Sequence, residues 1–365
     1  MRGEERQQRS MLMVLNLEQR VPRNHPLRRI KQLAETVLQG LSPSFDRMHR
    51  ATGRPAIPPE RLRKASLLMA LYTVRSERLL CEQLDYNLLF RWFLDLELDE
   101  ASFDHSSFSA NRTRLLEHEV AGEFFRGVVA QARALKLLSG EHFTVDGTLI
   151  EAWDSLKSFQ RKGAEASKRS DDDPGNPTVN FHGERRANET HQSTTDPEAL
   201  LARKGKGKEA KLYYSANALA ENRNFPLGDF QVEPADGKAE RRAAEAMADE
   251  RLAGSGRITL AGDKGYDTHG FVASCRALKI TPHVAQNHAR PGGGAALDAR
   301  TTRHPGYAVR QWMRKRIKEG FGWMKTIGGR RKTRYRGRAR VQWHAYLVAA
   351  AYNLPRIARL APAPT

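Results

Sequence analysis

The stretch HFTVDGTLIEAW, residues 142–153, decides the fold of this chain of 365 residues. Its alternating, β-branched pattern predicts a strand that ends at Gly147. The segment that follows, residues 154–211, is polar and rich in Gly, Pro and Lys, and it is predicted to be a long loop. We therefore expect one strand, followed by a long polar insertion, at the start of the C-terminal half.

Beyond the insertion the chain alternates between strand and helix patterns. The pattern predicts a two-strand hairpin at 211–236, a helix at 239–253, a strand at 257–262, a helix at 268–278, a strand at 279–285 and helices at 307–327 and 341–360. In the helix at 307–327, the apolar side is predicted to hold Trp312, Ile317, Phe321 and Met324. Sequential strands followed by strands on helical crossovers make a mixed α/β layer. This is the order of the ribonuclease-H-like fold, a mixed five-stranded sheet with flanking helices.

The N-terminal part has a different periodicity. Apolar residues of PPERLRKASLLMALYTVRSERLL recur at near-helical spacing, which predicts a small all-α domain. Its arginines on polar faces serve either packing and solubility or, as the sharper hypothesis, binding of DNA ends or assembly. The predicted division is an arm at 1–24, the helical domain at 25–135, a catalytic domain at 140–355 with the insertion at 154–211, and a tail at 356–365.

Charge is the most informative bulk property. The chain has 61 Lys and Arg against 42 Asp and Glu, a net charge of +19, and such an excess favours a polyanionic partner, most commonly nucleic acid. Charge alone does not separate a DNA enzyme from a ribosomal or packaging protein. No apolar run approaches a membrane span of about 20 residues, so we expect a cytoplasmic protein without a membrane partner. Cys81 and Cys275 are predicted to be buried thiols.

Two aspartates each lie beside a predicted strand end. Asp146 is in TVDGT and Asp263 is in AGDKGYD, and the first and fourth strands of this fold are neighbours. Hard carboxylate oxygens suit Mg²⁺ or Mn²⁺, and two such ions about 4 Å apart catalyse phosphodiester displacement. Either aspartate taken singly is an ordinary turn residue. Together with the fold and the charge, the pair favours metal ligands.

Five motifs, in order, resemble the transposases of bacterial insertion sequences that carry a DDE catalytic triad: HFTVDGTLIEA, NETHQSTTDPEA, RKGKGKEAKL, LAGDKGYD and RKRIKEGFGWMKTIGGRRKTRYRG. The resemblance extends over residues of about 10 to 355. It implies strand hydrolysis at transposon ends, attack of the 3′-hydroxyl on target DNA, and an assembly on DNA that is a dimer or larger. It also implies that Asp146 and Asp263 are the first two acids and hold two metal ions.

The third acid departs from the family pattern of Tyr, two residues, Arg, three residues, Glu, six residues and Lys. Arg314 and Lys325 match the basic positions, but the acid position holds Lys318. Glu319 is the only candidate acid nearby, and shifting the pattern by one residue to include it loses both basic matches. Adjacent helix residues point about 100° apart, so we expect Lys318 rather than Glu319 to face the aspartates. An alternative is therefore a catalytically impaired relative that binds DNA without cutting it.

The surrounding segment is strongly basic. Residues 310–340 contain thirteen Lys or Arg and one acid. A stretch of one charge sign beside a phosphate-cleaving site is predicted to follow a DNA backbone, a contact that positions DNA without reading its sequence. The predicted DNA-binding residues are Arg314, Lys325, Arg330, Arg331, Lys332, Arg334 and Arg336.

Overall fold

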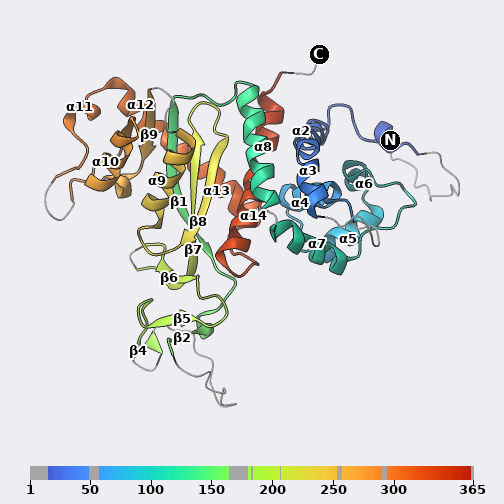
Figure 1. Ribbon diagram of the computed structural model, residues 1–365, viewed down its shortest axis with the longest axis horizontal. Helices are drawn as coiled ribbons and strands as arrows, with labels where there is room; N and C mark the ends of the chain where they lie inside the picture. Colours follow the sequence, from blue (N-terminus) through green and yellow to red (C-terminus); the bar gives the residue numbers. More distant parts are fainter. Residues whose placement is uncertain are drawn as a thin grey trace, which may run out of the picture.

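The computed structural model describes residues 15–48, 57–117, 119–163, 180–181, 184–205, 207–252, 257–289 and 294–362. A helical N-terminal part packs beside an α/β part, with long helices between them (Figure 1). The N-terminal helices are α1 (Leu17–Arg20), α2 (Pro26–Gly40), α3 (Ser42–Met48), α4 (Pro59–Leu71), α5 (Glu77–Tyr86), α6 (Leu88–Leu94), α7 (His105–Glu117) and α8 (Val120–Ala134). The predicted all-helical region is confirmed within the described residues.

The α/β part is built on one mixed sheet with the strand order β10-β9-β1-β7-β6, and β8 also pairs with β7. Its strands are β1 (His142–Glu151), β6 (Leu200–Arg203), β7 (Ala210–Glu221), β8 (Leu227–Pro234), β9 (Ile258–Gly262) and β10 (Ile280–Val284). β1 runs antiparallel to β7 and parallel to β9, and β10 runs parallel to β9. The ribonuclease-H-like order is therefore confirmed, with β6 as a sixth strand.

Two predictions about the first strand and the insertion are wrong in detail. β1 does not end at Gly147 but continues to Glu151, because β7 pairs with it along its whole length. The segment 154–211 is not all loop. It contains β6 and the short strands β2 (Phe159–Arg161), β3 (Asn180–Phe181), β4 (Glu184–Arg185) and β5 (His191–Ser193), while residues 164–179, 182–183 and 206 lie outside the described residues.

Helices cover both faces of the sheet. α9 (Ala239–Leu252) packs on β7 and β8, and with α10 (His269–Ala277) it shares an apolar cluster that includes Phe143 and Val145 of β1. α13 (Ile317–Thr326) contacts β1, and α14 (Arg338–Leu360) contacts β8. Because strand side chains alternate between faces, Asp146 lies on the face opposite to Val145, toward α13.

The long helix α14 joins the two parts of the molecule. It packs on β8 on one side and on α2, α4 and α8 on the other, and one continuous core runs from the N-terminal helices to the sheet. Asn353 is buried in this interface, where its Oδ1 accepts from Leu227 N at 2.8 Å and its Nδ2 donates to Leu227 O at 2.9 Å. α14 continues past the predicted domain end at 355, so residues 356–360 are helix rather than tail.

The predicted helix at 307–327 is divided. α12 (Pro305–Met313) is followed by the 3₁₀ turn η3 (Arg314–Arg316) and then by α13, and α11 (Ala299–Thr302) precedes them. Ile317, Phe321 and Met324 are buried as predicted, but Trp312 is 65% exposed. The prediction for Trp312 is wrong because Trp312 lies five residues before Ile317, which at about 100° per residue places it about 140° around the helix from the buried stripe.

Two further predictions concern burial and membranes. Cys81 and Cys275 are both free and buried, as expected. Within the described ranges, no helix is long and apolar enough to cross a lipid bilayer.

Candidate active site

Strand pairing brings Asp146 and Asp263 together. The last registered pair between the parallel strands is Thr144 with Ala261, so Asp146 and Asp263 each lie two residues further along neighbouring strands. β9 ends at Gly262 and the chain turns away in the 3₁₀ turn η2 (Lys264–Tyr266), for which Asp263 is the N-cap. Asp146 therefore lies in the middle of β1. The space beside it is open because β9, the parallel partner of β1, ends at Gly262.

The two carboxylates influence each other electrostatically. Burial first, and then the negative charge of Asp263, raise the pKa of Asp146, which is about 6. The Gly147 N–H, which donates to Asp146 Oδ1 at 3.0 Å, and the positive charges of Lys318 and Arg314 lower this pKa. Two acids beside each other in a partly buried position repel unless a cation or a proton lies between them.

A third carboxylate, Glu240, belongs to the same cluster and was not predicted from the sequence. It lies in the first turn of α9, against the backbone of Gly147: a Cβ atom at residue 147 would be 2.5 Å from its Cγ and 2.6 Å from its Oε1. Burial raises the pKa of Glu240, and so do the charges of Asp146 and Asp263. Gly147 thus lets Glu240 approach β1 on the face that α9 covers, where its charge acts on both aspartates, and no spacing pattern in the sequence indicates this.

Tyr266 forms the buried wall of this cluster. Its side chain is 1% exposed and its hydroxyl has no hydrogen-bond partner among the described residues. Burial raises the pKa of the phenol, and the charges of Glu240, Asp146 and Asp263 raise it further. The phenol therefore keeps its proton and presents an unused donor to the carboxylates.

The third-acid position of the family pattern carries a positive charge. Lys318 is one of the main charges that act on Asp146. Glu319 pairs weakly with Arg316 at 3.9 Å, with 63% of its side chain exposed, and its charge acts on Tyr352 of α14. The two neighbours on α13 thus act on different surroundings.

The two matched basic residues flank the aspartates. Lys325 donates to the hydroxyl of Thr148, which lies on the same face of β1 as Asp146. Burial lowers the pKa of Lys325, and the charges of Lys204 and Arg331 lower it further, while Asp146 raises it. Arg314 Nε donates to Gln311 Oε1 at 2.8 Å. The charges of both cations thus act on Asp146 or are acted on by it.

The remaining predicted DNA-binding residues lie on the segment after α13. Arg331, Lys332, Arg334 and Arg336 are exposed, and Arg336 pairs with Asp154 at 3.8 Å. Arg330 corrects the prediction, because it is 1% exposed and donates to Val341 O at 3.2 Å. It holds the segment onto α14 from within and does not reach a surface where DNA could bind.

The donor set fits a hard divalent cation at two positions and departs from the family pattern at the third. Asp146 and Asp263 supply the carboxylate oxygens that such ions prefer. Across the described residues, no three His, Cys, Asp or Glu side chains are gathered closely enough to form a ready-made metal site. The two aspartates would therefore be the ligands, with Glu240 as a further acid whose charge acts on both and Lys318 as an opposing charge.

A ribonuclease-H-like sheet with paired acids where parallel strands end defines a nucleic-acid strand-processing enzyme. Comparison with protein families agrees: a transposase domain (DUF772) matches residues 15–114 and a transposase DDE domain matches residues 139–354. The second match covers more than half of the chain, which therefore belongs to the DDE transposase family. Members of this family generally depend on a divalent metal ion.

Comparison with solved structures gives distant similarities. The Mos1 transposase paired-end complex with left transposon end is 12% identical, covers 85% of this chain and 80% of that chain, and has a TM-score of 0.19. The Mos1 strand transfer complex is also 12% identical over 85% of this chain and 79% of that chain, with a TM-score of 0.19. No curated protein matches this chain.

Proposed function

We propose that this DDE transposase binds the ends of its own insertion sequence, cuts a strand there, and joins the resulting 3′-hydroxyl to target DNA. The observation that carries the proposal is the pairing of Asp146 with Asp263 at the end of β9 in a chain of this family. The net charge of +19 supports DNA as the partner. We place this activity in the cytoplasm, at the nucleoid, in an assembly of two or more copies on DNA.

Asp146 and Asp263 would hold Mg²⁺ or Mn²⁺. The ion, when bound, would activate the attacking water or hydroxyl and stabilise the leaving oxygen of the phosphodiester. Arg314 and Lys325 would hold the phosphate of the scissile strand between them, because both lie beside Asp146. Holding the phosphate in a fixed position would make its reaction with the attacking hydroxyl effectively unimolecular, which lowers the entropic part of the barrier.

Glu240 would supply the third carboxylate that residue 318 lacks. It lies against Gly147, it shares its electrostatic environment with both aspartates, and the unpartnered hydroxyl of Tyr266 adjoins the same cluster. A carboxylate there offsets the charge of Lys318 near the metal position. The family match favours an active transposase over the alternative of a DNA-binding relative that cannot cut.

Cleavage of supercoiled DNA that carries the element's own ends, with Mg²⁺ or Mn²⁺, tests the proposal. We expect wild type to nick the ends and Asp146→Asn and Asp263→Asn to lose at least about a thousandfold in rate. Exposed Arg257→Gln, at the opposite end of β9, is the control and should cut like wild type. Nicking that persists in Asp146→Asn would overturn the assignment. Sedimentation of the protein on end DNA tests the assembly.

A further inference from the structure

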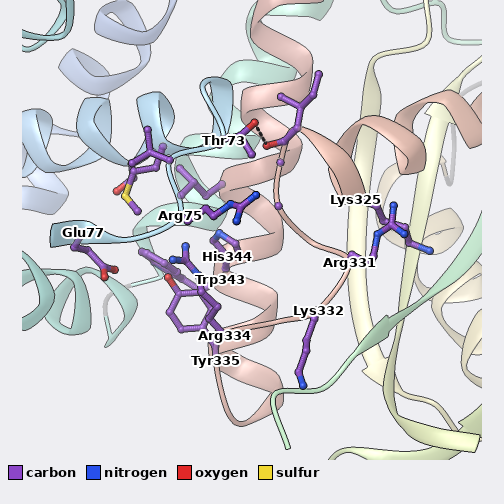
Figure 2. Close-up of a pocket in the computed structure, with 18 of the residues that line it drawn as sticks. Thr73, Arg75, Glu77, Lys325, Arg331, Lys332, Arg334, Tyr335, Trp343 and His344 are labelled. Atoms are coloured by element: carbon purple, nitrogen blue, oxygen red, sulfur yellow. Dashed lines mark hydrogen bonds between the residues drawn. The ribbon is translucent and has the colours of Figure 1, made fainter. Parts of the chain in front are cut away.

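A groove lies between the helical part and the segment 328–337 that follows α13. Its volume is about 350 Å³, and it is lined from one side by α4 and α5 with the turn between them, and from the other by the segment and α14. Figure 2 shows Arg75 and Glu77 from the helical part facing Arg334, Tyr335 and Trp343. The Thr73 hydroxyl donates to Ile327 O at 3.0 Å and closes one end.

The groove carries a net positive charge, because several Lys and Arg line it and Glu77 is the one acid among its lining residues. Glu77 is already engaged by Arg112. Arg75, Arg331 and Arg334 are exposed, and no carboxylate in the part of the chain that the structure describes forms an ion pair with them. Such a concave surface of one charge sign concentrates polyanions.

A buried cation, Arg63, lies behind the wall of the groove and adds to its positive charge. Arg63 of α4 is 0% exposed, and its guanidinium lies 5.4 Å from the ring centre of Trp343, which lines the groove. None of its three side-chain nitrogens has a hydrogen-bond partner among the described residues. Burial lowers the pKa of Arg63 only to about 10, so it stays charged at neutral pH. An anion in the groove would supply the counter-charge that the protein does not.

The segment 328–337 is held in place by backbone hydrogen bonds to β1. Thr333 N donates to Glu151 O at 2.8 Å and Glu151 N donates to Arg331 O at 3.2 Å, which fixes the segment to the end of β1. Lys325 lines the same groove and bonds to Thr148, two residues beyond Asp146. Lys325 is therefore shared between the groove and the surroundings of Asp146.

We propose that this groove binds one DNA strand in single-stranded form, as the continuation of the strand held at Asp146 and Asp263. This inference rests on the proposed function and adds the helical part to the DNA-binding machinery. A volume of about 350 Å³ accommodates one or two nucleotides of a single strand but not a duplex. Tyr335 lines the groove and is partly exposed beside Arg334; Arg112 lies 5.4 Å from its ring centre, and the remainder of the ring is available to a base. Arginine for the backbone and an aromatic ring for a base is the usual equipment of single-strand sites.

Fluorescence anisotropy tests the groove without requiring catalysis. The probes are a labelled 12-nucleotide oligo-dT and a labelled 12-base-pair duplex, both in EDTA, with the full-length chain. We expect Arg75→Glu and Arg334→Glu to bind the single strand about tenfold more weakly, with the duplex affected less than threefold. Arg75→Gln should lower the slope of log K against log salt by about 0.7, the value for one lost phosphate contact. Arg257→Glu carries the same charge change outside the groove and should bind both probes within twofold of wild type.

The outcomes separate this inference from the proposed function. If wild type binds neither probe nor end DNA, the proposed function fails. If wild type binds DNA but Arg75→Glu and Arg334→Glu behave like Arg257→Glu, the groove is not a DNA site and the transposase assignment stands. Equal losses on duplex and single strand would overturn the single-strand specificity. Arg75 and Arg334 are both exposed, so unchanged melting temperatures should accompany every variant, and agreement between the two variants guards against a local fold defect.

Discussion

Replacement of Lys318 by glutamate should strengthen divalent-metal binding. The Lys318 charge acts on Asp146, and Asp146 is partly buried beside Asp263 and Glu240. Changing one charge from +1 to −1 at roughly 8 Å from a divalent ion alters its energy by about 2 kcal/mol, even with the dielectric constant of water. Salt screening reduces this value and partial burial increases it. We therefore expect Mn²⁺ to bind Lys318→Glu at least about tenfold more tightly than wild type.

The assay is titration of Mn²⁺ followed by the electron paramagnetic resonance signal of the free ion, which needs neither DNA nor turnover. Lys315→Glu is the matched control, because Lys315 is exposed, lies three residues away, and is not among the charges that act on Asp146. It should bind Mn²⁺ within about threefold of wild type. Asp146→Asn should remove binding in every background.

Equal affinities for Lys318→Glu and Lys315→Glu would refute the reasoning, since position 318 would then lie outside the metal site. The cleavage assay adds a second result. If wild type cuts and Lys318→Glu cuts faster, the lysine moderates an active enzyme. Cutting by Lys318→Glu alone would establish the alternative, a DNA-binding relative disabled by one charge reversal.

Three further predictions concern the cluster and the fold. Glu240→Gln should weaken Mn²⁺ binding about tenfold in the same titration while leaving the melting temperature within about 2 °C, and unchanged affinity would exclude Glu240 from the site. Asn353→Ala should lower the free energy of unfolding by about 2–5 kcal/mol in urea denaturation, because the buried N–H and C=O of Leu227 lose both partners; a loss below about 1 kcal/mol would contradict this. Burial first, and then the charges of Arg310, His304 and His142, lower the pKa of His283 to about 4 from 6.5, so the folded state binds fewer protons than the unfolded state between these pH values. The free energy of unfolding should therefore fall by about 2 kcal/mol from pH 7 to pH 5 because of His283. In His283→Phe this contribution is absent, so the fall in free energy should be about 2 kcal/mol smaller than in wild type, as measured by urea denaturation at both pH values.

Much of the architecture could be predicted because it follows from local periodicity. The strand at 258–262, the hairpin around 222–226 and the helix at 239–252 each carry an apolar pattern of their own, and the order of these elements restricts the topology to few choices. Asp146 and Asp263 could be paired for the same reason, since the fold order makes their strands neighbours. The family resemblance then supplied the expected role of each acid.

Other features depend on contacts between distant segments and leave no local signal. A 3₁₀ turn at 314–316 divides the helix predicted at 307–327, and Trp312, predicted on its apolar side, is exposed. Arg330 is one of several neighbouring arginines in sequence, yet it alone turns inward against Val341. The sequence offers no difference between Arg330 and the neighbouring arginines. Only the packing against α14 shows that Arg330 is buried and the others are exposed.

The sequence by itself determined the fold class, the family and the two aspartates, because these follow from periodicity and motif order along the chain. The tertiary structure decided which charges lie around them. Glu240 approaches β1 because Gly147 has no side chain in its path, the charge of Lys318 acts on Asp146, and the charge of Glu319 acts on Tyr352. The direction of a side chain and the charges around it depend on how helices pack on the sheet, a property of three dimensions that no spacing in one dimension records.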